Sequence, residues 1–144
     1  MKTNHTDILD ILLVEDDADD IELLRKALED NSVQFRMFEI TRGDGVAPYL
    51  KTCKALPHVI VMDFNMPRVH GRELLRAFKA HKQFSKVPVV VLTTSAATED
   101  IDYAERLGAK GFLTKPTTIE GFNHAVHTIV RLSHFPNQSA ATAN

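Results

Sequence analysis

Two stretches of the chain are almost continuously apolar and rich in β-branched residues. They are HVIVMD, residues 58–63, and VPVVVLTT, residues 87–94. A strand with one solvated face alternates apolar and polar residues, whereas a strand buried on both faces is an unbroken apolar run. The sequence therefore predicts two central strands of a parallel sheet, at 58–62 and 87–92, with helices covering both sides of that sheet.

Three further apolar segments predict the remaining strands, at residues 8–14, 33–41 and 111–113. Segments with helical spacing alternate with the five strands. The first places Ile21, Leu24 and Leu28 on one side of a helix, and four more are predicted at about 45–54, 71–84, 98–107 and from about 117 onwards. Five strands alternating with five helices predict a (βα)5 doubly wound α/β fold.

One helix boundary and one buried stripe are specific enough to be tested. Gly108 follows the fourth helix, where a left-handed residue commonly ends a helix. The fifth helix is predicted to bury Ile119, Phe122, Val126 and Ile129.

Length and charge narrow the classes of function. One domain over residues 6–135 accounts for nearly all of the 144 residues, and residues 136–144 are predicted to be a disordered tail. The net charge of −2 lacks the basic footprint of a nucleic-acid-binding domain. We expect neither a signal peptide nor a membrane span, and the single Cys53 suits a reducing cytoplasm.

Polar residues gather where the predicted strands end. Glu15 and Asp16 follow the first strand, Asp63 the third, Thr93 and Thr94 the fourth, and Lys115 the fifth. Ligands of open parallel sheets bind outside the carboxyl ends of the strands. We therefore expect these side chains to form one site, whereas Asp17, Asp19 and Asp20 are expected mainly to cap the first helix.

Charge predicts what this site binds. No Lys or Arg adjoins the carboxylates in the sequence, so a hard divalent cation, Mg2+ or Mn2+, is the natural counter-charge. With Lys115 and Thr93 added, the site suits a phosphoryl group coordinated to that cation.

The motifs ILLVEDD, VIVMDFNMPRVHG, VPVVVLTTS and GAKGFLTKP occur in this order along the chain. In order and separation they resemble the receiver domain of two-component response regulators. The wording DFNMPRVHGRELL with LTTS is similar to small stand-alone receivers associated with phytochrome-type kinases. The resemblance implies a flavodoxin-like fold with strand order 2-1-3-4-5.

The resemblance also implies a role for each site residue. Asp63 would accept a phosphoryl group from a histidine kinase. Asp16, Asp63 and the backbone carbonyl of Asn65 would bind Mg2+ or Mn2+, with Glu15 acting through water. Lys115 and Thr94 would contact the phosphoryl group, while Thr93 and Phe112 would be the switch pair.

The function so implied is that of a phosphoacceptor signalling protein and not of an enzyme. Its partners would be a sensor histidine kinase, with a phytochrome-type kinase as the narrower expectation, and a second copy bound through the fourth helix, fifth strand and fifth helix. The alternatives are a phosphorelay shuttle or phosphate sink, and an aspartyl-nucleophile phosphohydrolase. The hydrolase would need a second aspartate where Asn65 stands.

Overall fold

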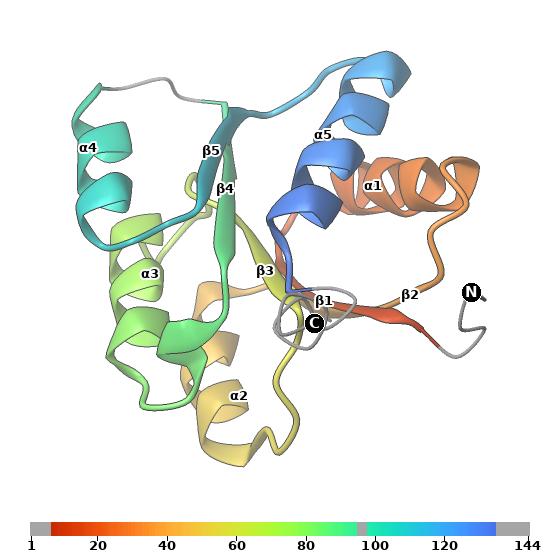
Figure 1. The fold of residues 1–144 in the computed structure, drawn as a ribbon. Helices are drawn as coiled ribbons and strands as arrows, with labels where there is room; N and C mark the ends of the chain where they lie inside the picture. The colour runs from red at the N-terminus through yellow and green to blue at the C-terminus, as the bar shows by residue number, and fades with distance from the viewer. Residues whose placement is uncertain (1–6, 95–97, 135–144) are drawn as a thin grey trace.

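The chain folds around one parallel sheet of five strands, as the sequence predicts (Figure 1). The computed structural model describes residues 7–94 and 98–134. The strands are β1 Leu9–Val14, β2 Phe35–Ile40, β3 Val59–Asp63, β4 Val89–Thr93 and β5 Gly111–Thr114. Their order in the sheet is β2-β1-β3-β4-β5, so the predicted doubly wound topology is confirmed.

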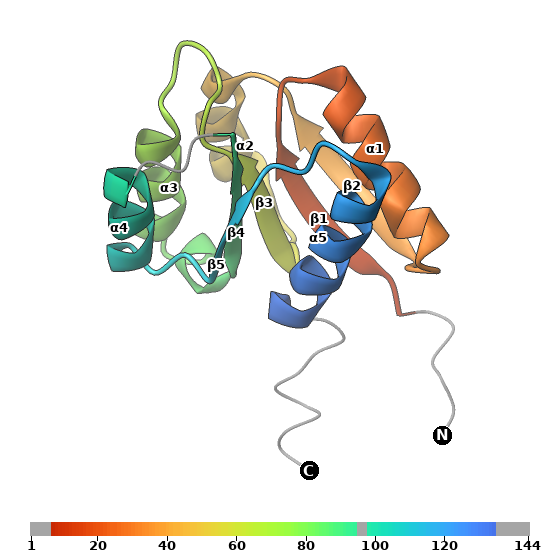
Figure 2. The ribbon, with the colours of Figure 1, turned by 90° about the horizontal axis from the view of Figure 1, so that it is seen from above.

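Helices cover both faces of the sheet. They are α1 Ala18–Asp30, α2 Val46–Thr52, α3 Gly71–Ala80, α4 Thr98–Arg106 and α5 Ile119–Leu132. Seen from above, α1 and α5 lie on one side of the sheet and α2, α3 and α4 on the other (Figure 2). Every residue of β3 and β4 is buried, as expected for strands covered on both faces.

The core forms two clusters, one on each face of the sheet. On the α1 and α5 face, Leu24 and Leu28 pack with Phe122 and Ile129. On the other face, Phe78 and its neighbours from α3 pack against β1, β3 and β4. The predicted buried residues of α1, which are Ile21, Leu24 and Leu28, are therefore confirmed.

Three helix ends test the sequence predictions. Gly108 has a φ of +90°, which confirms its left-handed conformation after α4. Helix α3 ends at Ala80 and not at residue 84, because His81 is extended and its ring Nδ1 accepts the N–H groups of Gln83 and Phe84.

Helix α5 begins at Ile119, so this residue lies in the first turn of the helix. Thr118 is the N-cap, and its hydroxyl accepts the N–H of Gly121 at 3.0 Å. Ile119 is 50% exposed, so its predicted place in the buried stripe is wrong, while Phe122, Val126 and Ile129 are buried.

The ends of the predicted domain, residues 6 and 135, and the tail 136–144 lie outside the described residues. No helix in the described part of the chain is both long and apolar enough to cross a membrane.

Candidate functional site

Sheet register brings three carboxylates together at the carboxyl ends of the strands. Val14 pairs with Met62, so Glu15 and Asp63 stand at equivalent places on neighbouring strands. With Asp16 they form a group whose carboxylate oxygens lie within 4.8 Å of one another. We call Glu15, Asp16 and Asp63 the acidic site. Clustered hard oxygen donors are the ligands that Mg2+ and Mn2+ prefer, so the residues fit the predicted cation.

Two of these three carboxylates are removed from water. Glu15 is 3% exposed and Asp63 is 4% exposed, while Asp16 is exposed. Burial raises the pKa of Glu15 from 4.5 to about 7, although hydrogen bonds from Lys115 and from the backbone N–H of Asp17 lower it. The protein thus holds a carboxylate where ionisation is costly without a cation nearby.

Lys115 is the basic side chain that reaches the acidic site. The residue before it, Thr114, pairs with Thr93 of β4, and the N–H of Lys115 donates to the carbonyl of Thr93 at 2.7 Å. Its Nζ lies 2.8 Å from Glu15, 2.9 Å from Asp20 and 3.2 Å from Asp63.

The pKa of Lys115 reflects these three partners. Burial lowers the pKa of this ammonium, but hydrogen bonds to Glu15 and Asp20 more than offset that effect and raise it above its ordinary value. One ammonium contacts three carboxylates, so its charged form is stabilised more by these contacts than the charged form of any single carboxylate is.

The acids that follow Asp16 divide between two roles. Asp17 is the N-cap of α1, and its carboxylate accepts the N–H groups of Asp19 at 2.9 Å and Asp20 at 3.2 Å. The side chain of Asp20 contacts Lys115 instead of capping the helix, so the expected capping role of Asp20 is wrong.

Asn65 connects the acidic site to the end of β4. Its N–H donates to Asp63 at 2.8 Å, and its side-chain oxygen accepts the hydroxyl of Thr93. The same oxygen accepts the N–H of Thr94 at 3.1 Å and its hydroxyl at 3.2 Å. Sequence reasoning considered only the backbone carbonyl of Asn65 and missed this role of its side chain.

Phe112 lies on β5, where it pairs with Val91, two residues before Thr93 on β4. Its ring is half-buried and meets the ring of Phe64 edge-on, with 6.0 Å between centroids. Phe64 directly follows Asp63 in the chain, so the predicted switch aromatic packs against the segment that carries the central carboxylate.

Helix α4 is attached to α3 largely through polar contacts. Arg72 of α3 pairs with Asp100 at 2.8 Å, and Arg76 donates to the hydroxyl of Tyr103 at 2.7 Å. The guanidinium of Arg72 also lies 5.0 Å from the centre of the Tyr103 ring. The buried residue of α4 is the small Ala104.

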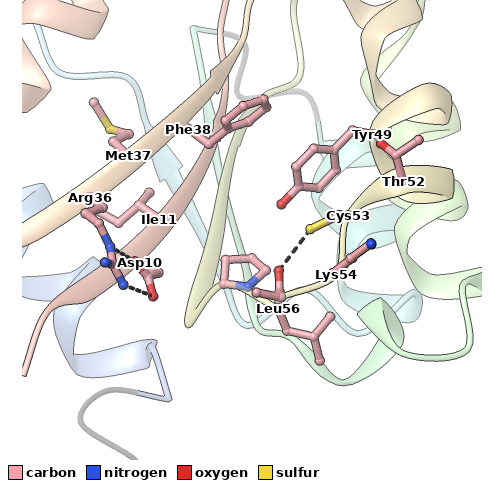
Figure 3. Close-up of a pocket in the computed structure, with 12 residues that line it drawn as sticks. Asp10, Ile11, Arg36, Met37, Phe38, Tyr49, Thr52, Cys53, Lys54 and Leu56 are labelled. Atoms are coloured by element: carbon pink, nitrogen blue, oxygen red, sulfur yellow. Dashed lines mark hydrogen bonds and ion pairs between the residues drawn. The ribbon is translucent and has the colours of Figure 1, made fainter.

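A separate hollow of about 670 Å3 lies at the opposite ends of the strands (Figure 3). Its walls include Phe38 and Tyr49, whose rings stack with 5.2 Å between centroids, and the exposed Leu56. Arg36 and Asp10 form an ion pair of 2.8 Å beside it. The residues predicted to form the functional site do not line this hollow.

Comparison with known proteins agrees with this arrangement. The sequence model of the response regulator receiver domain matches residues 11–127. The chain is 31% identical, over 83% of its length and 79% of the relative, to the probable methanogenesis regulatory protein FilR2 of Methanothrix harundinacea. It is 30% identical to response regulator Rcp1 of Synechocystis, over 76% of this chain and 78% of Rcp1.

Two solved structures share the fold closely. The phosphorylated cyanobacterial phytochrome response regulator RcpA superposes with a TM-score of 0.77 and 30% identity, covering 85% of this chain and 91% of RcpA. The Mn2+-bound form of Rcp1 gives a TM-score of 0.75 with 28% identity, covering 84% of this chain and 91% of that structure.

The chain belongs to the response regulator receiver domain family. Receiver domains are the phosphoryl-accepting signalling modules of two-component systems and partner with histidine kinases. They bind Mg2+ or Mn2+ at an acidic pocket, and they are not generally classed as enzymes.

Proposed function

We propose that Asp63 is the residue that accepts the phosphoryl group. The observation that carries the proposal is its position: a buried carboxylate at the end of a central strand, 3.2 Å from an ammonium. An oxygen of Asp63 attacks the phosphorus of a phosphohistidine, and the new O–P bond forms as the P–N bond breaks. The imidazole nitrogen keeps the electron pair.

The surrounding side chains stabilise charge on the phosphoryl oxygens. Lys115 donates to one oxygen with the proton that now points at Asp63. Thr93 exchanges its bond to Asn65 for a bond to a second oxygen, while the N–H of Thr94, which now faces the same Asn65 oxygen, serves as a further donor. The movement of Thr93 would leave space for Phe112 to turn inward, which is how the switch pair reports phosphorylation.

Replacing the acceptor tests the assignment. Asp63→Asn should take up no stable label from a phosphorylated histidine kinase, whereas Asp19→Asn, an exposed carboxylate change on the same side of the molecule, should be labelled like the wild type. Stable labelling of Asp63→Asn would show that another residue is the acceptor.

We further propose that Asp16, Asp63 and the backbone carbonyl of Asn65 bind one Mg2+ or Mn2+, with Glu15 in the outer shell. The grouped oxygens and the Mn2+-bound relative support this set. When bound, the cation supplies positive charge beside the phosphoryl oxygens. Asp16→Ala should weaken Mn2+ binding at least tenfold in a titration followed by paramagnetic line broadening. Unchanged affinity would exclude Asp16 as a ligand.

The proposed donor is a sensor histidine kinase in the cytoplasm, with a kinase of the phytochrome type as the narrower assignment. The structural relative RcpA is a phytochrome response regulator, which supports that class of kinase. Profiling of phosphotransfer from a panel of kinases would identify the donor, and preference for a kinase without a photosensory domain would overturn the narrower assignment.

We propose that the phosphorylated protein signals by dimerising through α4, β5 and α5. Helix α4 carries acids at 99, 102 and 105, while Lys110 and Arg131 offer the opposite charge. Leu132, near the end of α5, packs partly buried against the core and so does not offer an exposed apolar contact to a partner. Phe135 lies outside the described residues.

Sedimentation separates this dimer from a monomeric phosphoryl shuttle. With Mg2+ and saturating beryllofluoride, a phosphoryl mimic, the wild type should sediment as a dimer at tens of micromolar protein. A monomer under the same conditions would favour the shuttle.

A further inference from the structure

Asp20 contacts the acidic site although it lies outside the metal-binding group. Its carboxylate stands 2.9 Å from Nζ of Lys115 and is 20% exposed. Glu15, Asp16 and Asp63 form the group that fits a cation, and Asp20 is not one of them. A bound cation can therefore engage Glu15 and Asp63 without engaging Asp20.

The geometry of Lys115 uses all of its hydrogen-bond donors. An ammonium has three N–H groups. Nζ of Lys115 has three carboxylate neighbours, Glu15 at 2.8 Å, Asp20 at 2.9 Å and Asp63 at 3.2 Å. Because Glu15 and Asp20 hold two of the donors, the third is directed at Asp63, where the phosphoryl group is expected.

Glu15 and Asp20, the two carboxylates that hold Lys115, differ in their other hydrogen bonds. Oε1 of Glu15 faces Lys115 and Oε2 accepts the N–H of Asp17 at 3.1 Å, so a cation would compete for atoms already in use. The backbone of Asp20 is held independently of the cation site, because its N–H donates to the N-cap Asp17 at 3.2 Å. Asp20 is thus the partner of Lys115 that can remain unchanged when metal enters.

We infer that Asp20 is a positioning residue, which holds the ammonium of Lys115 aimed at the phosphoryl group on Asp63. This inference rests on the proposed function. It predicts an effect opposite in sign to that of simple charge. Removing a carboxylate from an acidic site would by itself strengthen the binding of an anion, whereas loss of the positioning contact weakens it.

The first test measures Lys115 without any phosphoryl donor. Ammonium protons held in charge-assisted hydrogen bonds exchange slowly with water. We expect an NMR signal from the Lys115 ammonium in the metal-free wild type and in Asp19→Ala, and its loss in Asp20→Ala. Asp19 is the matched control, because it is exposed in the same helical turn and is not among the described ion-pair partners of Lys115.

The second test measures affinity for beryllofluoride at saturating Mg2+. We expect Asp20→Ala to bind about tenfold more weakly than the wild type, which corresponds to about 1.4 kcal/mol. Asp20→Asn keeps an acceptor oxygen without the charge and should lie between the two. Asp19→Ala should bind as tightly as the wild type or more tightly.

The outcomes separate this inference from the proposed function. Equal or tighter binding by Asp20→Ala would overturn the inference and leave Asp20 as a background charge. A wild type that binds no beryllofluoride would overturn the proposed function, and the ammonium signal of Asp20→Ala would then decide the role of Asp20 alone. Retention of that signal would refute the positioning contact.

Discussion

Replacing Glu15 by Gln should change how the stability of the metal-free protein depends on pH. Burial raises the pKa of Glu15 from 4.5 to about 7 in the folded chain. Between these values the unfolded chain ionises this carboxyl and the folded chain does not, so folding loses free energy as the pH rises. This difference in pKa corresponds to ~3 kcal/mol of folding free energy, at about 1.36 kcal/mol per pH unit. The loss begins near pH 4.5 and is complete above pH 7.

The assay is urea unfolding in a metal chelator at several pH values. At pH 4.5 the wild type and Glu15→Gln should be similarly stable, and by pH 8 the variant should be the more stable of the two by up to ~3 kcal/mol. Glu22→Gln, at an exposed position of α1, serves as the control. A difference between wild type and Glu15→Gln that is the same at every pH would refute the reasoning.

Three further changes should have measurable effects. In chelator, Asp16→Ala should raise the free energy of unfolding by ~1 kcal/mol by relieving repulsion; lower stability would contradict this. Burial lowers the pKa of His58, whose Nδ1 accepts the N–H of Asp10, so the wild type should lose stability relative to His58→Gln as the pH falls below 6.5; parallel pH curves would disprove it. Gly71→Ala would place a Cβ 2.4 Å from Cδ1 of Phe64 and should cost ~2 kcal/mol by thermal unfolding; an unchanged melting temperature would count against it.

The strands could be predicted because their burial is visible in the apolar residues of each strand's own segment of sequence. An unbroken apolar run such as 59–62 can be read without knowing its neighbours. Helix ends were harder to predict, because an apolar residue beyond the last helical turn can be buried without being helical. The helix predicted over 71–84 reaches Phe84, which is buried, yet Phe84 enters the core from a separate 3-10 turn at Phe84–Lys86.

The site was predictable to the extent that strand ends determine it. Glu15, Asp63, Thr93 and Lys115 meet because parallel strands end at the same edge of the sheet. The contact between Asp20 and Lys115 depends instead on how the first turn of α1 sits beside the loop after β5. Nothing in the local sequence of either residue encodes that distance.

The polar contacts that attach α4 to α3 make this helix sensitive to the ionic strength of the solution. Its contacts with α3 are the pair between Arg72 and Asp100 and the guanidinium groups around Tyr103, with only Ala104 buried beneath. Dissolved ions screen exposed charge pairs over about 8 Å at physiological ionic strength, whereas apolar burial is not screened. The exposed contacts of the Arg76 guanidinium with Tyr103 are therefore open to screening, whereas the Arg72–Asp100 pair, in direct contact at 2.8 Å with Asp100 14% exposed, is screened much less. Ionic strength thus acts on α4 whether or not Asp63 carries a phosphoryl group.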